Sequence, residues 1–400
     1  MAAEPEGRDE DDVVVHVAWA PDVLDYDFGA GHPMSPERLD LTFRLAQSLG
    51  VLDGVDLVPP AVASDALLRT VHEAEYVAAV REAGAHGTPD PERGLGTSDD
   101  PVFPAMHEAS ARAVGGSVEA ALAVWSGRAR HGVNVGGGLH HAMPGAASGF
   151  CVYNDAAVAI RALLDAGARR VAYVDTDAHH GDGVQAVFWD DPRVLTISIH
   201  ETGAALFPGT GFPGEVGGPA ARGYAVNVAL PSRTGDEGWL RAFDAVVPDA
   251  LREFAPDVVV SQHGCDAHVL DPLTRLRISV DAQRLVAVRV HELAHEVSDG
   301  RWVALGGGGY AVVDVVPRAW THLLAVALHR PVDPTTPVPR AWLDLVQQRH
   351  GRQGPSTMGD GVTPVLRPWS SGYDPGDEVD RAIRATRAAA FPYLGLDPEA

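Results

Sequence analysis

Short β-branched runs alternate with amphipathic helical patterns along most of this chain, and this alternation constrains the fold more than any other feature. Seven runs predict strands, at 13–19, 132–137, 170–177, 193–200, 224–230, 257–264 and 301–307. Helical periodicity predicts helices at 37–49, 106–125, 153–166, 237–254, 281–297 and 314–328. This order predicts an α/β fold, a single parallel sheet in a three-layer domain with helices on both faces.

The chain has three predicted parts. Residues 1–12, MAAEPEGRDEDD, are acidic and poor in apolar side chains, so we expect them to be disordered. Residues 13–330 hold the alternating strands and helices. Residues 331–400 begin with the proline-rich stretch PVDPTTPVPRAW, which cannot continue a helix or a strand. It predicts a linker to a C-terminal appendage that packs on the main domain and contains a helix near 378–389.

Charge and composition exclude several functions. All 31 basic residues are arginine, against 54 acidic residues, and the net charge of −23 would repel a polyphosphate. Without lysine there is no Walker-type phosphate loop. The two cysteines, Cys151 and Cys265, fit a reducing compartment. The start of the chain lacks signal-peptide features, and no apolar run reaches about 18 residues. We therefore expect a cytoplasmic protein with neither a nucleic-acid nor a membrane partner.

The segment VDTDAHHGDG at 174–183 points to a metal site. Asp175, Asp177 and His179 share one face if the strand continues, and carboxylate with imidazole suits a divalent ion such as zinc. Because ligands bind beyond the carboxyl ends of parallel strands, a third ligand should follow another strand. Asp266 in SQHGCDAH meets this requirement. Two further strands lead into GGGLHHAMPG, with His140 and His141, and LGGGGY, with Tyr310; these groups together suit the hydrolysis of an amide.

These motifs resemble the zinc-dependent histone deacetylase family, closest to the bacterial acetoin-utilisation branch of that arginase-like superfamily. The resemblance runs from about residue 13 to the C-terminus, with five motifs in the family's order. It implies zinc, with Fe²⁺ as the alternative metal, bound by Asp177, His179 and Asp266. It implies a catalytic set in which two histidines are hydrogen-bonded to two aspartates and a tyrosine donates to the oxyanion: His140, His141, Asp175, Asp182 and Tyr310.

The resemblance also implies residues around the substrate and two sites for K⁺ or Na⁺. A narrow tunnel for lysine methylenes would be lined by Gly149, Phe150, Phe207 and Leu273. Asp99, or Asp100 in the alternative register, would be the rim aspartate that accepts hydrogen bonds from the substrate backbone. Arg38 would be the basic residue that lines the exit channel for acetate. The first monovalent site would use Asp175, Asp177, His179 and Ser198, and the second Phe188, Asp191, Val194 and Tyr224.

The resulting hypothesis is a zinc-dependent deacetylase that hydrolyses the acetyl amide of N6-acetyl-lysine in proteins to lysine and acetate. The alternative is an acetylpolyamine amidohydrolase acting on a small acetylated amine. A binuclear arginase-like ureohydrolase is more remote, since His268 stands where a second metal would want a carboxylate. The sequence leaves open the acyl-chain length, the oligomeric state, and which histidine is the base.

One further motif matches a metalloprotease. HELAH at 291–295 has the H-E-x-x-H spacing, with His291 and His295 on one helix face. The metzincin pattern continues with a glycine and then a third histidine ligand, and Ser298 and Arg301 stand at those two positions. We therefore expect a solvated helix face, and we expect His291→Ala to leave activity and metal content nearly intact.

Overall fold

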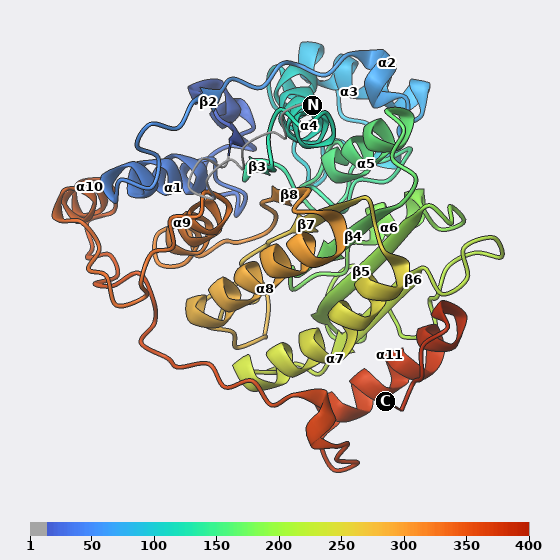
Figure 1. Cartoon of the computed structure of the whole chain (residues 1–400). Helices are drawn as coiled ribbons and strands as arrows, with labels where there is room; N and C mark the ends of the chain where they lie inside the picture. Colours follow the sequence, from blue (N-terminus) through green and yellow to red (C-terminus); the bar gives the residue numbers. More distant parts are fainter. Residues whose placement is uncertain (1–13, 400) are drawn as a thin grey trace, which may run out of the picture.

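The computed structural model describes residues 14–399, which build one eight-stranded parallel sheet (Figure 1). The predicted disorder of 1–12 lies outside the described residues. Across the sheet the strands are β2 (Leu57–Val58), β1 (Val15–Ala18), β3 (His131–Asn134), β8 (Trp302–Leu305), β7 (Val258–Gln262), β4 (Val171–Asp175), β5 (Val194–Glu201) and β6 (Ala225–Leu230). The predicted fold class is confirmed. Each predicted run overlaps a strand, and only β2 is additional, because two residues carry no periodicity.

Helices cover both faces of this sheet, as β4 illustrates. Ala172 and Val174 point into the core shared with α1 (Glu37–Ser48), α7 (Asp236–Phe254), α8 (Val280–Ser298) and α9 (Val316–Ala327). Val171 and Tyr173 point into the opposite core, shared with α3 (Ala74–His86), α4 (Met106–Trp125) and α5 (Asp155–Asp165). Because both faces of β4 are buried, its successive side chains before Asp175 are all apolar, and this continuous apolar run is what predicted the strand. The short helices are α2 (Asp65–Leu68) and α6 (Asp182–Val187).

The C-terminal segment contributes α10 (Arg340–His350) and α11 (Glu378–Leu394), which lie against the outer helices (Figure 1). Trp342 of α10 is buried, and its indole N–H donates to the Leu41 carbonyl of α1 at 2.9 Å. Arg241 of α7 and Asp380 of α11 are both fully buried, and an Arg241 nitrogen donates to Asp380 Oδ2 at 2.8 Å. A buried ion pair needs its partner in place, so these contacts tie the segment to the α/β unit.

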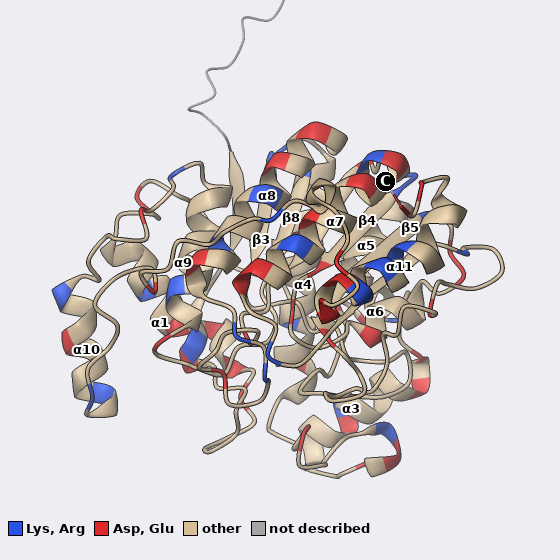
Figure 2. Cartoon of the chain, turned by 90° about the horizontal axis from the view of Figure 1, so that it is seen from below, with Lys and Arg blue, Asp and Glu red and all other residues tan. Residues whose placement is uncertain are grey.

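Charged residues of both signs occur along the same helices. Figure 2 shows basic and acidic positions interspersed along the helices in that view. Within 14–399, no helix is both long and apolar enough to cross a membrane. Since all strands run parallel, their carboxyl ends meet at one edge of the sheet and their amino ends at the other. Each of these two edges carries a cluster of potential metal ligands.

Candidate active site

The first cluster, Asp177, His179 and Asp266, lies at the carboxyl edge of the sheet. Asp177 and His179 follow β4, and Asp266 follows the neighbouring strand β7. Their ligand atoms lie within 4.8 Å of one another and all three residues are buried. His179 Nδ1 is 3.1 Å from Asp177 Oδ1 and 2.9 Å from Asp266 Oδ2. The structure therefore brings together the three residues predicted to bind the metal.

The chain does not reach this geometry as the extended strand we expected. Strand β4 ends at Asp175, and the next residues turn. The Asp177 amide donates to Asp175 Oδ1 at 3.2 Å, and the His179 amide donates to Asp177 Oδ1 at 2.9 Å. Two successive turns closed by aspartate side chains thus replace the strand, and they present alternate residues to the same side.

The cluster fits a cation. Burial and the neighbouring charge of Asp177 raise the pKa of Asp266 to about 7, so two carboxylates share this space without enough positive charge. Gln262 Nε2 and the Gly308 amide donate to Asp177 Oδ2 at 2.8 and 2.9 Å. A side chain at Gly308 would collide with Asp266 Oδ2, so the glycine keeps the ligand space clear. Two carboxylates and one imidazole leave further coordination positions open.

His140 and His141 lie beside the cluster, each with its own aspartate. His140 Nδ1 is 2.8 Å from Asp175 Oδ2, and His141 Nδ1 is 2.7 Å from Asp182 Oδ1. The carboxylates accept from Nδ1, which turns both Nε2 atoms toward each other at 3.0 Å. Burial lowers the pKa of His140, but Asp175 and Asp177 outweigh burial and raise it to about 9. Burial and the adjacent His140 lower the pKa of His141 to about 4. The pair can therefore hold one proton between them at neutral pH.

Tyr310 reaches the same cavity from the end of β8, after four successive glycines at 306–309. Burial and then the Asp266 and Asp177 charges raise the pKa of its phenol well above the ordinary value, so the hydroxyl keeps its proton for donation. The Tyr310 amide donates to Asp271 Oδ2 at 2.8 Å, while Asp271 Oδ1 accepts from the Leu273 amide at 3.0 Å. Asp271 thereby connects the tyrosine to the loop that carries Leu273.

Aromatic side chains surround the cavity. The Phe150 ring lies edge-on to Tyr310 with centroids 5.6 Å apart, and Phe207 lies edge-on to His141 at 5.0 Å. Gly149 has a φ of +54°, and a Cβ there would come within 2.6 Å of His141 and 2.8 Å of Phe207. Phe207 and Leu273 are 43% and 37% exposed, which puts them at the outer end. Gly149, Phe150 and Phe207 lie against residues of this site, Leu273 is connected to it through Asp271, and their role in lining the substrate stays a prediction.

Arg38 is buried behind the tyrosine loop. One of its guanidinium nitrogens donates to the carbonyls of Gly307 and Gly309 at 2.9 and 3.2 Å. Arg38 also lines a second cavity together with Met34, and Met34 lines the catalytic cavity as well. The arginine thus supports the loop of Tyr310, and its role beside an acetate exit stays a prediction.

The two acidic rim candidates have opposite environments. Asp99 is exposed, whereas Asp100 is 1% exposed. His32 Nδ1 accepts from the Met34 amide, so its Nε2 donates to the Asp99 carbonyl at 3.1 Å. The His32 ring also lies edge-on to Phe150 at 4.6 Å. His32 therefore connects the rim loop to the tunnel wall, and only the Asp99 side chain is available to a substrate from solvent.

Four residues that contact this machinery had no signal strong enough to select them from the sequence. Tyr173 donates its hydroxyl to Asp175 at 2.8 Å, and its period-two spacing from Asp175 was the only clue. The other three lie in ordinary strand or loop sequence and acquire their partners through the fold; they are His32, Gln262 and Asp271.

The first predicted monovalent set lies at and beside the carboxyl end of β4, whereas the second lies at the amino ends of β5 and β6, since Val194 begins β5 and Tyr224 directly precedes β6. Ser198 is paired in register with Asp175, and its hydroxyl lies 2.8 Å from His200 Nδ1. In the second set, Asp191 and Val194 are joined through a backbone hydrogen bond of 3.1 Å, and the Tyr224 carbonyl accepts from the neighbouring strand. Both sites remain predictions.

The expectation for HELAH was wrong in one respect. His291 and His295 do not lie on a solvated face, because both are only partly exposed and His295 Nε2 contacts the buried His131 at 3.2 Å. Glu292, which a protease would need beside its metal, is exposed and pairs with Arg289 at 2.8 Å. The motif is therefore not arranged for proteolysis.

Comparison with known proteins agrees with this geometry, since residues 32–327 match the histone deacetylase domain. The chain belongs to the histone deacetylase family. It is 44% identical over 345 residues to the acetoin utilization protein AcuC of Bacillus subtilis (strain 168), covering 86% of this chain and 89% of that protein. It is 40% identical over 329 residues to AcuC of Staphylococcus xylosus, covering 81% and 85%.

A solved structure of a histone deacetylase homologue, described as complexed with SAHA, has the same fold. Its TM-score is 0.80 at 28% sequence identity, and the match covers 93% of this chain and 99% of that one. The family resemblance read from the motifs is thus confirmed. The chain is accordingly an amide hydrolase of the deacetylase type.

Proposed function

We propose that this histone deacetylase family member is zinc-dependent and removes the acetyl group from N6-acetyl-lysine in proteins, releasing lysine and acetate. The observation that carries the proposal is the convergence of Asp177, His179 and Asp266 with the paired His140 and His141 at one buried edge. Fe²⁺ is compatible with the same carboxylate and imidazole ligands.

The three ligands would hold the zinc ion at the base of the cavity. Zinc supplies a Lewis acid for the amide carbonyl and lowers the pKa of a coordinated water to about 7. The absence of a nearby fourth protein ligand among the described residues leaves room for water and substrate. His268, where an arginase-like enzyme would want a carboxylate for a second metal, instead lies 2.9 Å from Asp360. This pairing favours one metal at this site over the binuclear alternative.

Proton transfer would be shared by the histidine pair. One imidazole takes a proton from water and one returns a proton to the leaving amine, and His141 is the better candidate for the second step. Asp175 and Asp182 hold the rings with Nε2 toward the reaction. Tyr310 would donate its phenol proton in a hydrogen bond to the developing oxyanion.

The tunnel favours a neutral, extended substrate arm. Acetyl-lysine is uncharged, so its methylenes can lie between Phe150 and Phe207 with little desolvation cost. After hydrolysis the ammonium product is charged, and its desolvation in the same aromatic channel favours release. An acetylated polyamine is the second candidate, because the exposed carboxylate of Asp99 would also attract a cationic chain.

The test is one assay panel on purified protein of defined metal content. It compares acetyl-lysine peptides, acetylated spermidine or putrescine, and lysine peptides with longer acyl groups. We expect the acetyl-lysine peptide to have the highest kcat/KM. A higher kcat/KM for the acetylated polyamine would replace the protein substrate with the polyamine. No hydrolysis of any panel member by zinc-loaded or iron-loaded protein would contradict the proposal.

A further inference from the structure

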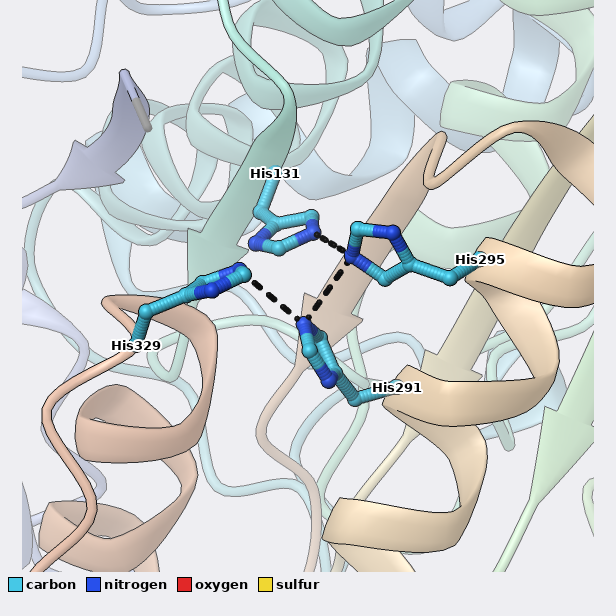
Figure 3. Close-up of side chains that lie close together, drawn as sticks. All are labelled: His131, His291, His295 and His329. Atoms are coloured by element: carbon cyan, nitrogen blue, oxygen red, sulfur yellow. Dashed lines mark hydrogen bonds between the residues drawn. The ribbon is translucent and has the colours of Figure 1, made fainter. Parts of the chain in front are cut away.

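Four histidines meet at the amino edge of the sheet, far along the strands from the catalytic cavity (Figure 3). His131 begins β3, His291 and His295 lie on the last turns of α8, and His329 follows α9. Their ligand nitrogens all lie within 4.8 Å of one another. Figure 3 shows the four rings pointing toward a common centre from three separate elements.

The contacts in this cluster run in a chain through the Nε2 atoms. His131 Nε2 lies 3.2 Å from His295 Nε2, His295 Nε2 lies 3.1 Å from His291 Nε2, and His291 Nε2 lies 3.1 Å from His329 Nε2. An imidazole Nε2 offers a single in-plane position, either one proton or one lone pair. His291 and His295 each have two such neighbours. Protons on neutral rings can therefore satisfy at most two of the three contacts.

A tetrahedral cation would satisfy all four nitrogens at once. Zinc binds imidazole nitrogen at about 2.0–2.1 Å, which separates the ligands of a tetrahedron by about 3.3 Å. The three measured separations of 3.1 to 3.2 Å are close to that value. Small movements of the rings would complete the coordination without rearranging the backbone.

The protonation state of His131 suits a metal. His131 Nδ1 lies 2.8 Å from the Ala327 carbonyl, which must accept a proton from it, so the Nε2 lone pair faces the cluster. His131 is buried and His329 is exposed, which gives a metal ion a path from solvent.

We propose that His131, His291, His295 and His329 form a tetrahedral binding site for a divalent transition metal of the zinc class. Four protein ligands leave no position for substrate, so the site is structural. It joins the first residue of β3 to α8 and to the chain leaving α9. Glu292 of the intervening motif points to solvent and takes no part. The site is separate from the catalytic metal ligands, which lie at the opposite edge of the sheet.

The test counts metal in a chain whose catalytic site is disabled. Asp266→Ala protein is stripped with chelator, incubated with Zn²⁺, freed of excess metal and analysed for zinc. We expect about one zinc ion per chain to remain, and Co²⁺ in its place to give the visible absorption of tetrahedral coordination. Zinc should also raise the thermal midpoint of the stripped protein by about 3 °C or more.

Two variants from different elements remove one ligand each. His329 has a φ of +54°, a conformation that glycine adopts freely, so His329→Gly removes the imidazole and relieves the backbone. His291→Gln removes a ligand from α8, and this proposal replaces the sequence-based expectation that a change at His291 leaves the metal content intact. His86→Gln is the matched control, since His86 is an exposed histidine on α3. In the Asp266→Ala background, each ligand variant should lose the zinc and the thermal shift, and the control should keep both.

Two results would overturn the proposal. One is folded Asp266→Ala protein that retains no zinc and shows no thermal shift. The other is zinc retention that neither His329→Gly nor His291→Gln reduces. Either variant suffices if the other fails to fold, because the ligands come from different elements. With the catalytic site intact, His329→Gly should keep its deacetylase kcat at 25 °C within about twofold, which separates this site from the proposed reaction.

Discussion

The two edges of the same parallel sheet gather metal-ligand side chains by different chemistry. At the carboxyl edge, two buried carboxylates and one imidazole face each other, within reach of the histidine pair. At the amino edge, four imidazoles meet without a carboxylate, and one of them is exposed. In both sets the ligand atoms lie within 4.8 Å of one another.

The number and charge of the ligands distinguish the proposed reactive site from the proposed structural site. Three protein ligands leave coordination positions open for water and substrate, whereas four close the tetrahedron. The carboxyl edge also holds groups whose pKa values move in opposite directions: His140 rises to about 9, His141 falls to about 4 and Asp266 rises to about 7. Such opposed shifts are typical of catalytic sites. At the amino edge, burial lowers the pKa of His131 and His291 alike.

The largest expected effect comes from removing a catalytic ligand. Asp177→Ala or Asp266→Ala should abolish deacetylase activity and the metal bound at the carboxyl edge, because each removes a charged ligand. Metal at the four-histidine cluster should remain, and the fold should survive, since these residues lie beyond the strand ends. Metal analysis and activity are measured together, with the exposed Asp344→Ala as the control. Full activity in either ligand variant would mean that the metal ligands at the carboxyl edge are not needed for the reaction.

Tyr310→Phe should have the next largest effect. It keeps the ring that packs on Phe150 but loses the phenol proton, so kcat should fall about a hundredfold or more while metal content is unchanged. Steady-state kinetics and metal analysis are the measurements, with the exposed Tyr393→Phe as the control. A nearly normal kcat would mean that the tyrosine is only a wall of the pocket.

Asp99→Ala should have a smaller effect that depends on the substrate. If its carboxylate accepts hydrogen bonds from peptide amides, kcat/KM for an acetyl-lysine peptide should fall about 5- to 150-fold, as for a lost charged hydrogen bond. A small acetylated amine has no such amides and should lose much less. Equal, small losses on both substrates would contradict the rim role, and a larger loss on an acetylated polyamine would favour the polyamine reaction.

The smallest expected effect is that of Asp100→Asn, which should change the free energy of unfolding by an amount that depends on pH. Burial, then Asp99, raises the pKa of Asp100 in the folded protein to about 8, and Asp100 Oδ1 has no hydrogen-bond partner. Between pH 4 and 8 the unfolded chain loses this proton while the folded protein keeps it, so stability falls as pH rises. The variant lacks this loss and should be more stable than the parent at pH 8 by on the order of 1–2 kcal/mol.

Denaturant unfolding of both proteins at pH 5 and pH 8 checks this effect. The difference between them should be larger at pH 8, where the buried carboxylate of the parent must either stay protonated or ionise without a partner. If the two proteins differ in free energy of unfolding by the same amount at both pH values, burial does not raise the pKa of Asp100.

The catalytic edge was largely predictable because its residues follow strands. Period-two spacing after one predicted strand indicated Asp177 and His179, and the position after another predicted strand indicated Asp266. The supporting contacts were not predictable. Gln262 and Asp271 hold a ligand and the tyrosine loop through single hydrogen bonds that depend on how the loops turn. Residue type alone does not carry that information.

By itself, the sequence determined the parallel sheet and its helical cover and indicated the residues that gather at the carboxyl edge, because periodicity is local and parallel strands bring their carboxyl ends to one edge. It did not determine what HELAH contacts. Read locally, the motif matched a protease and was assigned to a solvated face. Only the tertiary structure decided that His131, 164 residues from His295, and the exposed His329 would meet the two helix histidines. Strand β3 and the end of α9 are adjacent solely through the sheet order, a long-range property that no segment of the chain encodes alone.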